Sequence, residues 1–139
     1  MNDAHLFRAA RDCSFKSDYS GGNKAQVGCI AVYKNTILAK GWNSDKTHTD
    51  QAKFNVARFK NCGNNYLPNK VHAEVAALSK IKFLDIDFSQ VHVYVYRELK
   101  NGELGLARPC PACQAAIKKL GIRNIHYTTH DGYCYEIWK

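Results

Sequence analysis

Features that would place this chain in a membrane or outside the cell are missing from its sequence. No apolar run approaches the roughly 20 residues that a helix needs to span a bilayer. The first residues, Met1 to His5, lack the basic and then apolar layout of a secretory signal. Repeats, low-complexity tracts and obvious linkers are also absent. We therefore expect a cytoplasmic protein with no membrane partner, in which residues 1–139 form a single domain.

Acidic residues are scarce beside basic ones. There are 12 Asp and Glu against 20 Lys and Arg, which gives a formal net charge of +8. The surplus is uneven: residues 43–70 hold five basic and two acidic side chains, and residues 97–123 hold six and two. Net charge alone can serve solubility, but this clustering favours an anionic partner such as a nucleotide or a nucleic acid.

Hydrophobic periodicity predicts an α/β fold, in which helices sandwich a mixed sheet of five strands. Helices are predicted over residues 3–16, 70–80 and 111–121, and strands over residues 27–33, 36–42, 90–97, 122–129 and 133–138. The last two strands are joined through His130-Asp131-Gly132, which is too short for a crossover helix and predicts an antiparallel C-terminal hairpin. The long polar stretch over residues 43–69 is expected to be functional, with a possible short helix at 51–59.

Three residues have the chemistry and spacing of a metal site. Inside a cell, a close pair such as Cys110 and Cys113 more often binds a metal or does redox work than forms a disulfide. Their i, i+3 spacing puts both sulfurs on one helical face, and His72 adds a nitrogen donor. Two thiolates and one neutral imidazole balance the charge of Zn²⁺ and leave its fourth tetrahedral position for water, as in catalytic zinc sites.

Glu74 distinguishes a catalytic site from a structural one. Residues i and i+2 point about 200° apart around a helix, so His72 and Glu74 can converge only beyond the end of that helix. His72 can then hold the ion while the carboxylate lies beside it without ligating it. A structural zinc site formed by Cys110 and Cys113, with His72 an ordinary buried histidine, would require neither Glu74 nor Asn43.

The run His72-Ala73-Glu74 followed by Pro109-Cys110-Pro111-Ala112-Cys113 resembles the signature of the zinc-dependent cytidine deaminase-like superfamily. The resemblance covers most of the chain, because the predicted order of elements is also that of the superfamily. It implies a bound Zn²⁺, with Glu74 as the catalytic proton shuttle. The reaction implied is hydrolytic removal of the exocyclic amine from a nucleobase, giving uracil from cytosine.

The resemblance also implies contacts with the substrate. Asn43 is the candidate for the sugar, although a turn-forming role explains an Asn there nearly as well. The backbone N–H of Ala73 would meet the base carbonyl, and the backbone carbonyl of Arg108 would accept from the amine. His48 is a candidate for the pocket entrance or an ordinary solvated histidine. Independently of the resemblance, the aromatic residues Phe54, Phe59 and Tyr66 of the long loop are candidates for stacking on a base, and at least two of them are expected to serve packing alone.

The C-terminal hairpin is similar to the branch that contains free cytidine, blasticidin and toxin or phage deaminases. His72 departs from free cytidine deaminases, which usually have Cys there, and the basic charge fits a phosphate-bearing substrate. We therefore expect a zinc-dependent deaminase of cytosine in cytidine or deoxycytidine nucleosides or nucleotides, or in single-stranded DNA. The alternatives are deamination of adenine or guanine, or a non-enzymatic zinc-stapled module that binds nucleic acid. A homo-oligomer is expected, as in relatives.

Overall fold

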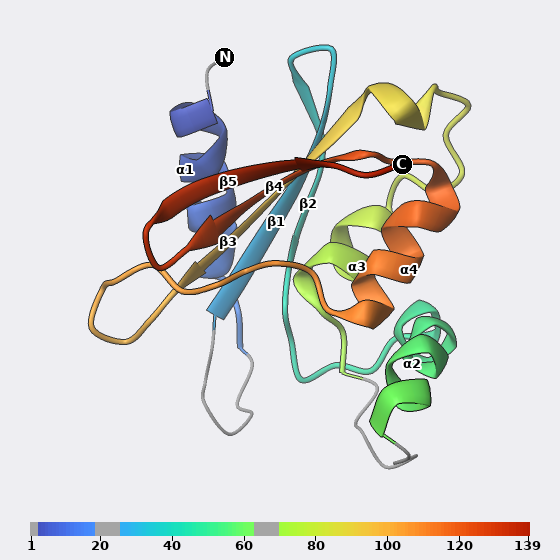
Figure 1. Cartoon of the computed structure of the whole chain (residues 1–139), viewed down its shortest axis with the longest axis horizontal. Coiled ribbons are helices and arrows are strands. Elements are labelled where there is room, and N and C mark those ends of the chain that lie inside the picture. Colours follow the sequence, from blue (N-terminus) through green and yellow to red (C-terminus); the bar gives the residue numbers. More distant parts are fainter. Residues whose placement is uncertain (1–2, 19–25, 63–69) are drawn as a thin grey trace.

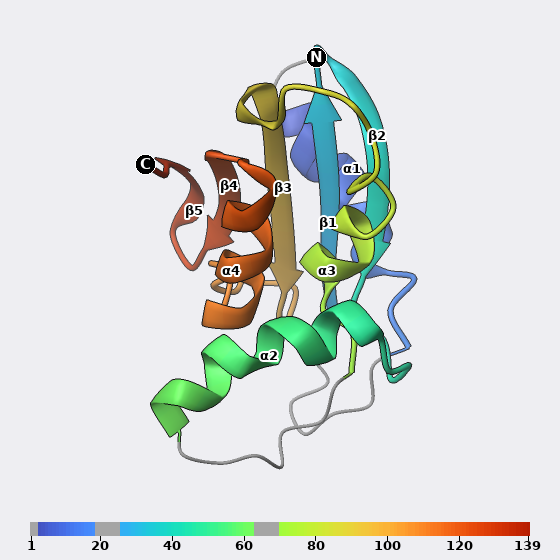
Figure 2. The same ribbon diagram turned by 90° about the vertical axis from the view of Figure 1, so that its right-hand side faces the viewer.

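The computed structural model describes residues 3–18, 26–62 and 70–139, with the backbone alone at 56–62. One sheet has the strand order β2-β1-β3-β4-β5. Its strands are β1 (Gln26–Tyr33), β2 (Thr36–Trp42), β3 (Val91–Glu98), β4 (Asn124–Thr129) and β5 (Gly132–Ile137). The helix α1 (Asp3–Ser14) covers one face (Figure 1), and α2 (Thr49–Cys62), α3 (Ala73–Leu78) and α4 (Pro111–Leu120) lie on the other (Figure 2).

Strand pairing confirms the expected mixed sheet. β1 is antiparallel to both β2 and β3, β3 runs parallel to β4, and β4 is antiparallel to β5. The pair Thr129↔Gly132 closes the last hairpin, where Gly132 has a positive φ of 134° that favours glycine. The C-terminal hairpin is therefore antiparallel, as its short connection requires.

Alternation along β3 divides the core into two layers. Val91, Val93 and Val95 belong to the cluster that includes the buried residues of α3 and α4. Tyr94 and Tyr96 belong to the cluster formed with α1. Since successive side chains of a strand point to opposite faces, the Val-His-Val-Tyr-Val-Tyr run supplies an apolar face to each helical layer.

Two glycines allow the helices to approach the sheet closely. A Cβ at Gly41 would lie 2.5 Å from both the carbonyl oxygen of Ala73 and the amide nitrogen of Ala77, so α3 packs directly on the β2 backbone. A Cβ at Gly28 would overlap the carbonyl oxygen of Ala10 in α1. The position of α3, which begins beside the site described below, thus depends on the absence of a side chain at Gly41.

The prediction for the helix over residues 70–80 is wrong at its start. Thr47 and Lys70 form a β-bridge, the Val71 amide donates to the Lys46 carbonyl at 2.9 Å, and the Ser44 amide donates to the Val71 carbonyl at 3.1 Å. These bonds hold residues 70–71 extended, so α3 begins only at Ala73. The possible helix at 51–59 is present and longer, as α2.

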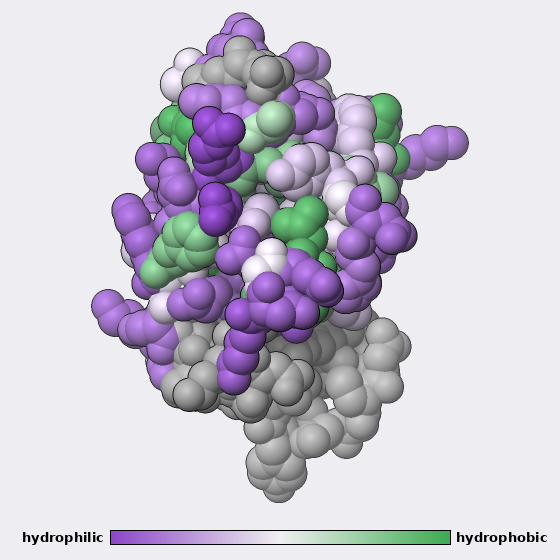
Figure 3. Space-filling model, turned by 90° about the vertical axis from the view of Figure 1, so that its left-hand side faces the viewer, coloured by the Kyte–Doolittle hydropathy of each residue, from purple (hydrophilic) through white to green (hydrophobic). Residues whose placement is uncertain are grey.

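The side of the molecule that carries α1 and β5 is mainly hydrophilic, with separate hydrophobic patches among the polar side chains (Figure 3). Tyr133, Tyr135 and Ile137 are exposed on β5, which is an edge strand and alternates between exposed and half-buried residues. No helix in the described part of the chain is both long enough and apolar enough to cross a membrane.

Candidate active site

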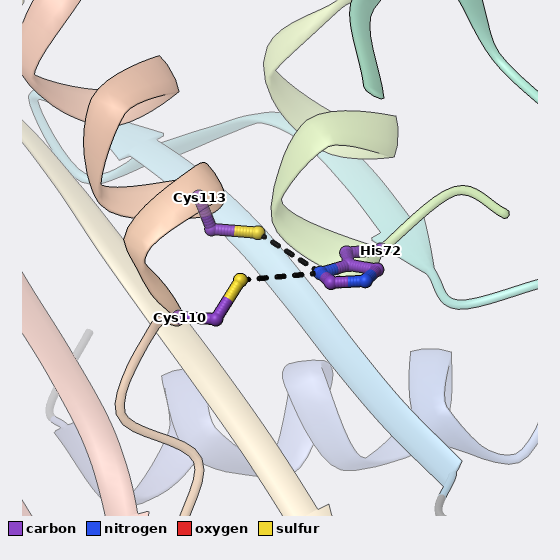
Figure 4. Close-up of side chains that lie close together, drawn as sticks. All are labelled: His72, Cys110 and Cys113. Atoms are coloured by element: carbon purple, nitrogen blue, oxygen red, sulfur yellow. Dashed lines mark hydrogen bonds between the residues drawn. The ribbon is translucent and has the colours of Figure 1, made fainter. Parts of the chain in front are cut away.

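The first residues of two helices bring the three predicted metal ligands together. His72 is the N-cap of α3 and Cys110 the N-cap of α4, with Cys113 in the first turn of α4 and Pro111 at its first position. The two helices start side by side, so the three side chains point toward one another (Figure 4). Nδ1 of His72 lies 3.3 Å from Sγ of Cys113 and 3.5 Å from Sγ of Cys110.

These distances fit a zinc ion. With bonds of about 2.0 Å to nitrogen and about 2.3 Å to sulfur, a tetrahedral zinc separates such donors by about 3.5 Å. The observed separations agree within a few tenths of an ångström, and the three donor atoms all lie within 4.8 Å of one another. Among the described residues, this is the one group of three His, Cys, Asp or Glu side chains that could hold a metal.

The two sulfurs differ in how readily they ionise. A hydrogen bond from Cys113 and the nearby His72 hold the pKa of Cys110 well below its usual range. The pKa of Cys113 is raised by the same contact with Cys110, by burial and by the charge of Glu74. One thiolate is therefore stable without further help, whereas holding both as thiolates requires a cation between them.

Glu74 lies immediately beside this cluster. It is the second residue of α3, it is only 6% exposed, and its carboxylate makes a side-chain hydrogen bond with Cys113. Burial raises its pKa, against the opposing charge of His72. His72 stands at the N-cap and Glu74 in the first turn of α3. Their side chains therefore converge beyond the start of the helix, although residues i and i+2 point about 200° apart around it.

Two buried polar residues of α2 fix the backbone at His72, and the sequence analysis did not find them. The His72 amide donates to Oε1 of Gln51 at 3.0 Å, and Nε2 of Gln51 donates to Oδ1 of Asn55 at 2.8 Å. Both amide side chains are fully buried. In the sequence, only their i, i+4 spacing indicates that Gln51 and Asn55 could interact. That spacing does not reveal which side of the helix is buried.

The segment before Cys110 is fixed by contacts with β4, β5 and α4. The Ala107 amide donates to the Thr128 carbonyl at 2.9 Å, and Nε2 of Gln114 donates to the Pro109 carbonyl at 2.8 Å. The Arg108 guanidinium pairs with Glu136 at 2.8 Å. Arg108 is thus held near the site by its side chain, which leaves its backbone carbonyl as the predicted substrate contact.

Two predicted substrate residues have structural contacts of their own. Asn43 is buried, and its Oδ1 accepts from the Val27 amide at 2.9 Å while its own amide donates to the Val27 carbonyl at 3.2 Å. Nδ1 of His48 accepts from the Asp50 amide at 3.0 Å, just before α2. Asn43 therefore fastens the end of β2 to β1, and His48 supports the first turn of α2.

The structure describes only some of the remaining residues that were predicted to contact the substrate. Ala73 is fully buried and starts α3, where the first amides have no partner within the helix. Phe54 packs against the core formed with α3 and α4. The Phe59 side chain and Tyr66 lie outside the described residues.

Residues 1–129 match the family model described as the cytidine and deoxycytidylate deaminase zinc-binding region. The chain belongs to this deaminase family. A comparison with curated proteins returned no match. Zinc is the cofactor of the family, and His72, Cys110 and Cys113 are positioned to hold it.

Solved structures of deaminases have the same fold. The chain is similar to the dCMP deaminase of cyanophage S-TIM5 in its apo form, with 22% identity, a TM-score of 0.60, and coverage of 93% of this chain and 86% of that one. The same phage enzyme in complex with dCMP and dUMP gives 19% identity, a TM-score of 0.57, and coverage of 93% and 84%. The cytidine deaminase of Burkholderia pseudomallei gives 18% identity, a TM-score of 0.66, and coverage of 99% and 93%.

Proposed function

We propose that this deaminase hydrolyses the exocyclic amine of a cytosine base, in cytidine or deoxycytidine as nucleoside or nucleotide, so that the base becomes uracil and ammonia is released. The observation that carries the proposal is the buried Glu74 carboxylate beside the His72, Cys110 and Cys113 cluster. Three protein donors leave one position of a tetrahedral ion for water, whereas a closed structural site uses four. A carboxylate beside that position can accept a proton from the water and deliver it to the substrate.

The roles of the residues follow from this arrangement. Zinc held by His72, Cys110 and Cys113 would supply a water molecule whose pKa is strongly lowered. Glu74 accepts a proton from that water, transfers it to the ring nitrogen beside the reacting carbon, and delivers a second proton to the departing amine. The water oxygen ends as the carbonyl oxygen of uracil, and its two protons end on the ring nitrogen and on ammonia.

Hydrogen bonds within the protein limit how the proposed substrate-binding residues can contact a substrate. Asn43 remains proposed for the sugar, from a position fixed by the hydrogen bond that its Oδ1 accepts from the Val27 amide. Since Nδ1 of His48 accepts from Asp50, a contact at the pocket entrance falls to Nε2. The Ala73 N–H and the Arg108 carbonyl remain proposed for the base. The net charge of +8 supports a phosphate-bearing substrate.

The experiment incubates purified zinc-loaded protein with cytidine, deoxycytidine, dCMP, adenosine, guanine and single-stranded DNA, and measures ammonia and the product base. We expect uracil products from a cytosine substrate. Glu74→Gln, which keeps the shape of the side chain, should retain zinc and lose turnover. Deamination of adenosine or guanine alone would move the substrate to a purine, and a steep loss of activity with salt would indicate a polynucleotide. Full activity in Glu74→Gln would refute the proposed mechanism.

A further inference from the structure

A cavity lies between α2, α3 and α4, apart from the three metal donors. Its volume is about 290 Å³, and none of His72, Cys110 and Cys113 lines it. Its residues come from α2, from α3 and the turn after it, and from the later turns of α4, and none of them is a metal donor. The three helices meet on this side of the sheet (Figure 2). The cavity is therefore a separate site that the proposed reaction does not use.

The inner surface of this cavity is apolar. Phe54 of α2, Val75 and Leu78 of α3, and Ala116 of α4 line it, and all four belong to or pack against the core. Phe83 lines the cavity too and is 85% exposed, with the Lys82 ammonium 5.0 Å above its ring. An occupant with a flat or aliphatic body would cover this surface and remove it from water.

The charged residues that line the cavity are mostly cationic. Lys53, Lys82 and Lys119 line it, and Asp50 is the one carboxylate among the described lining residues. Asp50 is already paired with Lys82, whose Nζ lies 2.8 Å from Oδ2. Lys53 and Lys119 both line the cavity, and the neighbouring Lys119 ammonium lowers the pKa of Lys53. An anion between these two lysines would relieve their repulsion.

We propose that this cavity binds a small organic anion, a carboxylate or a phosphate ester carried on an aromatic or short aliphatic body. The volume is at the lower end of ligand pockets, about 300 Å³, which suits an occupant no larger than a substituted naphthalene. Inorganic phosphate would leave the apolar surface uncovered, and a neutral ring would leave the repulsion between Lys53 and Lys119 in place. The anionic group of such a ligand would lie beside the lysines, and its apolar body would cover the apolar wall of the cavity.

The test is calorimetric titration of the zinc-loaded protein with 2-naphthoate, 2-naphthyl phosphate and the neutral 2-naphthamide. At least one of the two anions should bind in a saturable manner, and the amide about tenfold more weakly or not at all. Whichever anion binds more tightly distinguishes a carboxylate ligand from a phosphate ester. Phe83→Ala, which changes a side chain with little burial, should weaken binding by removing part of the apolar wall.

The chain offers a matched control on one helix. Lys118 and Lys119 are adjacent and exposed on the last turn of α4, but Lys118 lies 5.3 Å over the Trp138 ring and does not line the cavity. Lys119→Glu and Lys53→Glu should each weaken binding of the anion about fivefold or more, while Lys118→Glu should leave it within about twofold.

Four results would overturn the proposal. The first three are absence of saturable binding for both anions at roughly millimolar concentration, equal affinity for the amide, and equal weakening by Lys118→Glu and Lys119→Glu. Circular dichroism of each variant checks that the fold is retained. Binding that ignores Lys53→Glu and Lys119→Glu would place the anion elsewhere and would equally overturn the proposal.

Discussion

Acidification should destabilise the protein through His126, which is almost completely buried in the sheet layer on the α1 side. Its ring stacks between Tyr94 and Tyr135, with centroid distances of 4.0 and 4.2 Å. Its Nε2 lies 2.9 Å from Nδ1 of His92, and its Nδ1 lies 3.9 Å from the Asp3 carboxylate. Burial lowers the pKa of His126 to about 4, against the raising effect of Asp3.

The sign and size of the effect follow from linkage. The unfolded chain takes up a proton near pH 6.5, whereas the folded chain resists it until about pH 4. The free energy of unfolding should therefore be fully retained above pH 6.5 and fall as the pH drops toward 4. The difference between the two pKa values corresponds to a loss of about 3 kcal/mol. His92, whose pKa is also lowered by burial, adds a loss of the same sign.

The assay is urea unfolding of the wild type and His126→Phe between pH 7.5 and 4, both loaded with zinc. Phe keeps the ring stack but cannot titrate, so the loss of stability on acidification should be smaller in the variant by about 2 to 3 kcal/mol. Comparing the two proteins cancels effects of acid on the zinc ligands, and His130→Gln in the exposed hairpin turn serves as the control. Equal pH dependence in the wild type and His126→Phe would refute the reasoning.

Two further substitutions test the framework around the site. Gln51→Leu leaves the His72 amide and the buried Asn55 side chain without Gln51 as their partner, and it should cost about 2 to 3 kcal/mol of unfolding free energy and loosen zinc binding. Thermal unfolding and competition with a chelator measure both effects, and unchanged values would contradict the role of Gln51. Gly41→Ala forces a Cβ against Ala73 and Ala77, so it should cost about 2 kcal/mol or more. The control is Gly105→Ala, where an added Cβ would meet only flexible side-chain atoms of Leu99 and Arg97, at 3.1 to 3.2 Å; if both variants lose the same stability, close packing of α3 on β2 is not the cause.

Local patterns in the sequence predicted most elements and the metal ligands. The Cys110-x-x-Cys113 spacing with Pro111 fixes two sulfurs at the start of a helix, and the Asp-Gly turn after His130 fixes an antiparallel hairpin. The family match and the sheet confirm the fold class and the zinc cofactor. The catalytic role of Glu74 and the substrate contacts remain predictions.

Contacts between residues far apart in the sequence determined where α3 begins and which backbone group Gln51 binds. The pairing of Lys70 and Val71 with residues 44–47 delayed the start of α3 by three residues, because hydrogen bonds to another segment replaced those of a helix. Gln51 reaches the His72 backbone from 21 residues away, and its choice of partner depends on how α2 lies across α3 and α4.

The sequence by itself determined which atoms are available for chemistry: one imidazole, two sulfurs and one carboxylate, each near the start of a helix. The start of α4 and the C-terminal hairpin are set by neighbouring residues, so their positions can be read from short motifs. Only the tertiary structure decided that α3 and α4 begin side by side, because their relative placement depends on the sheet beneath them and on the close packing at Gly41. The proximity of Lys53 and Lys119 arises in the same way, because these two lysines lie on different helices and more than 60 positions apart in the chain.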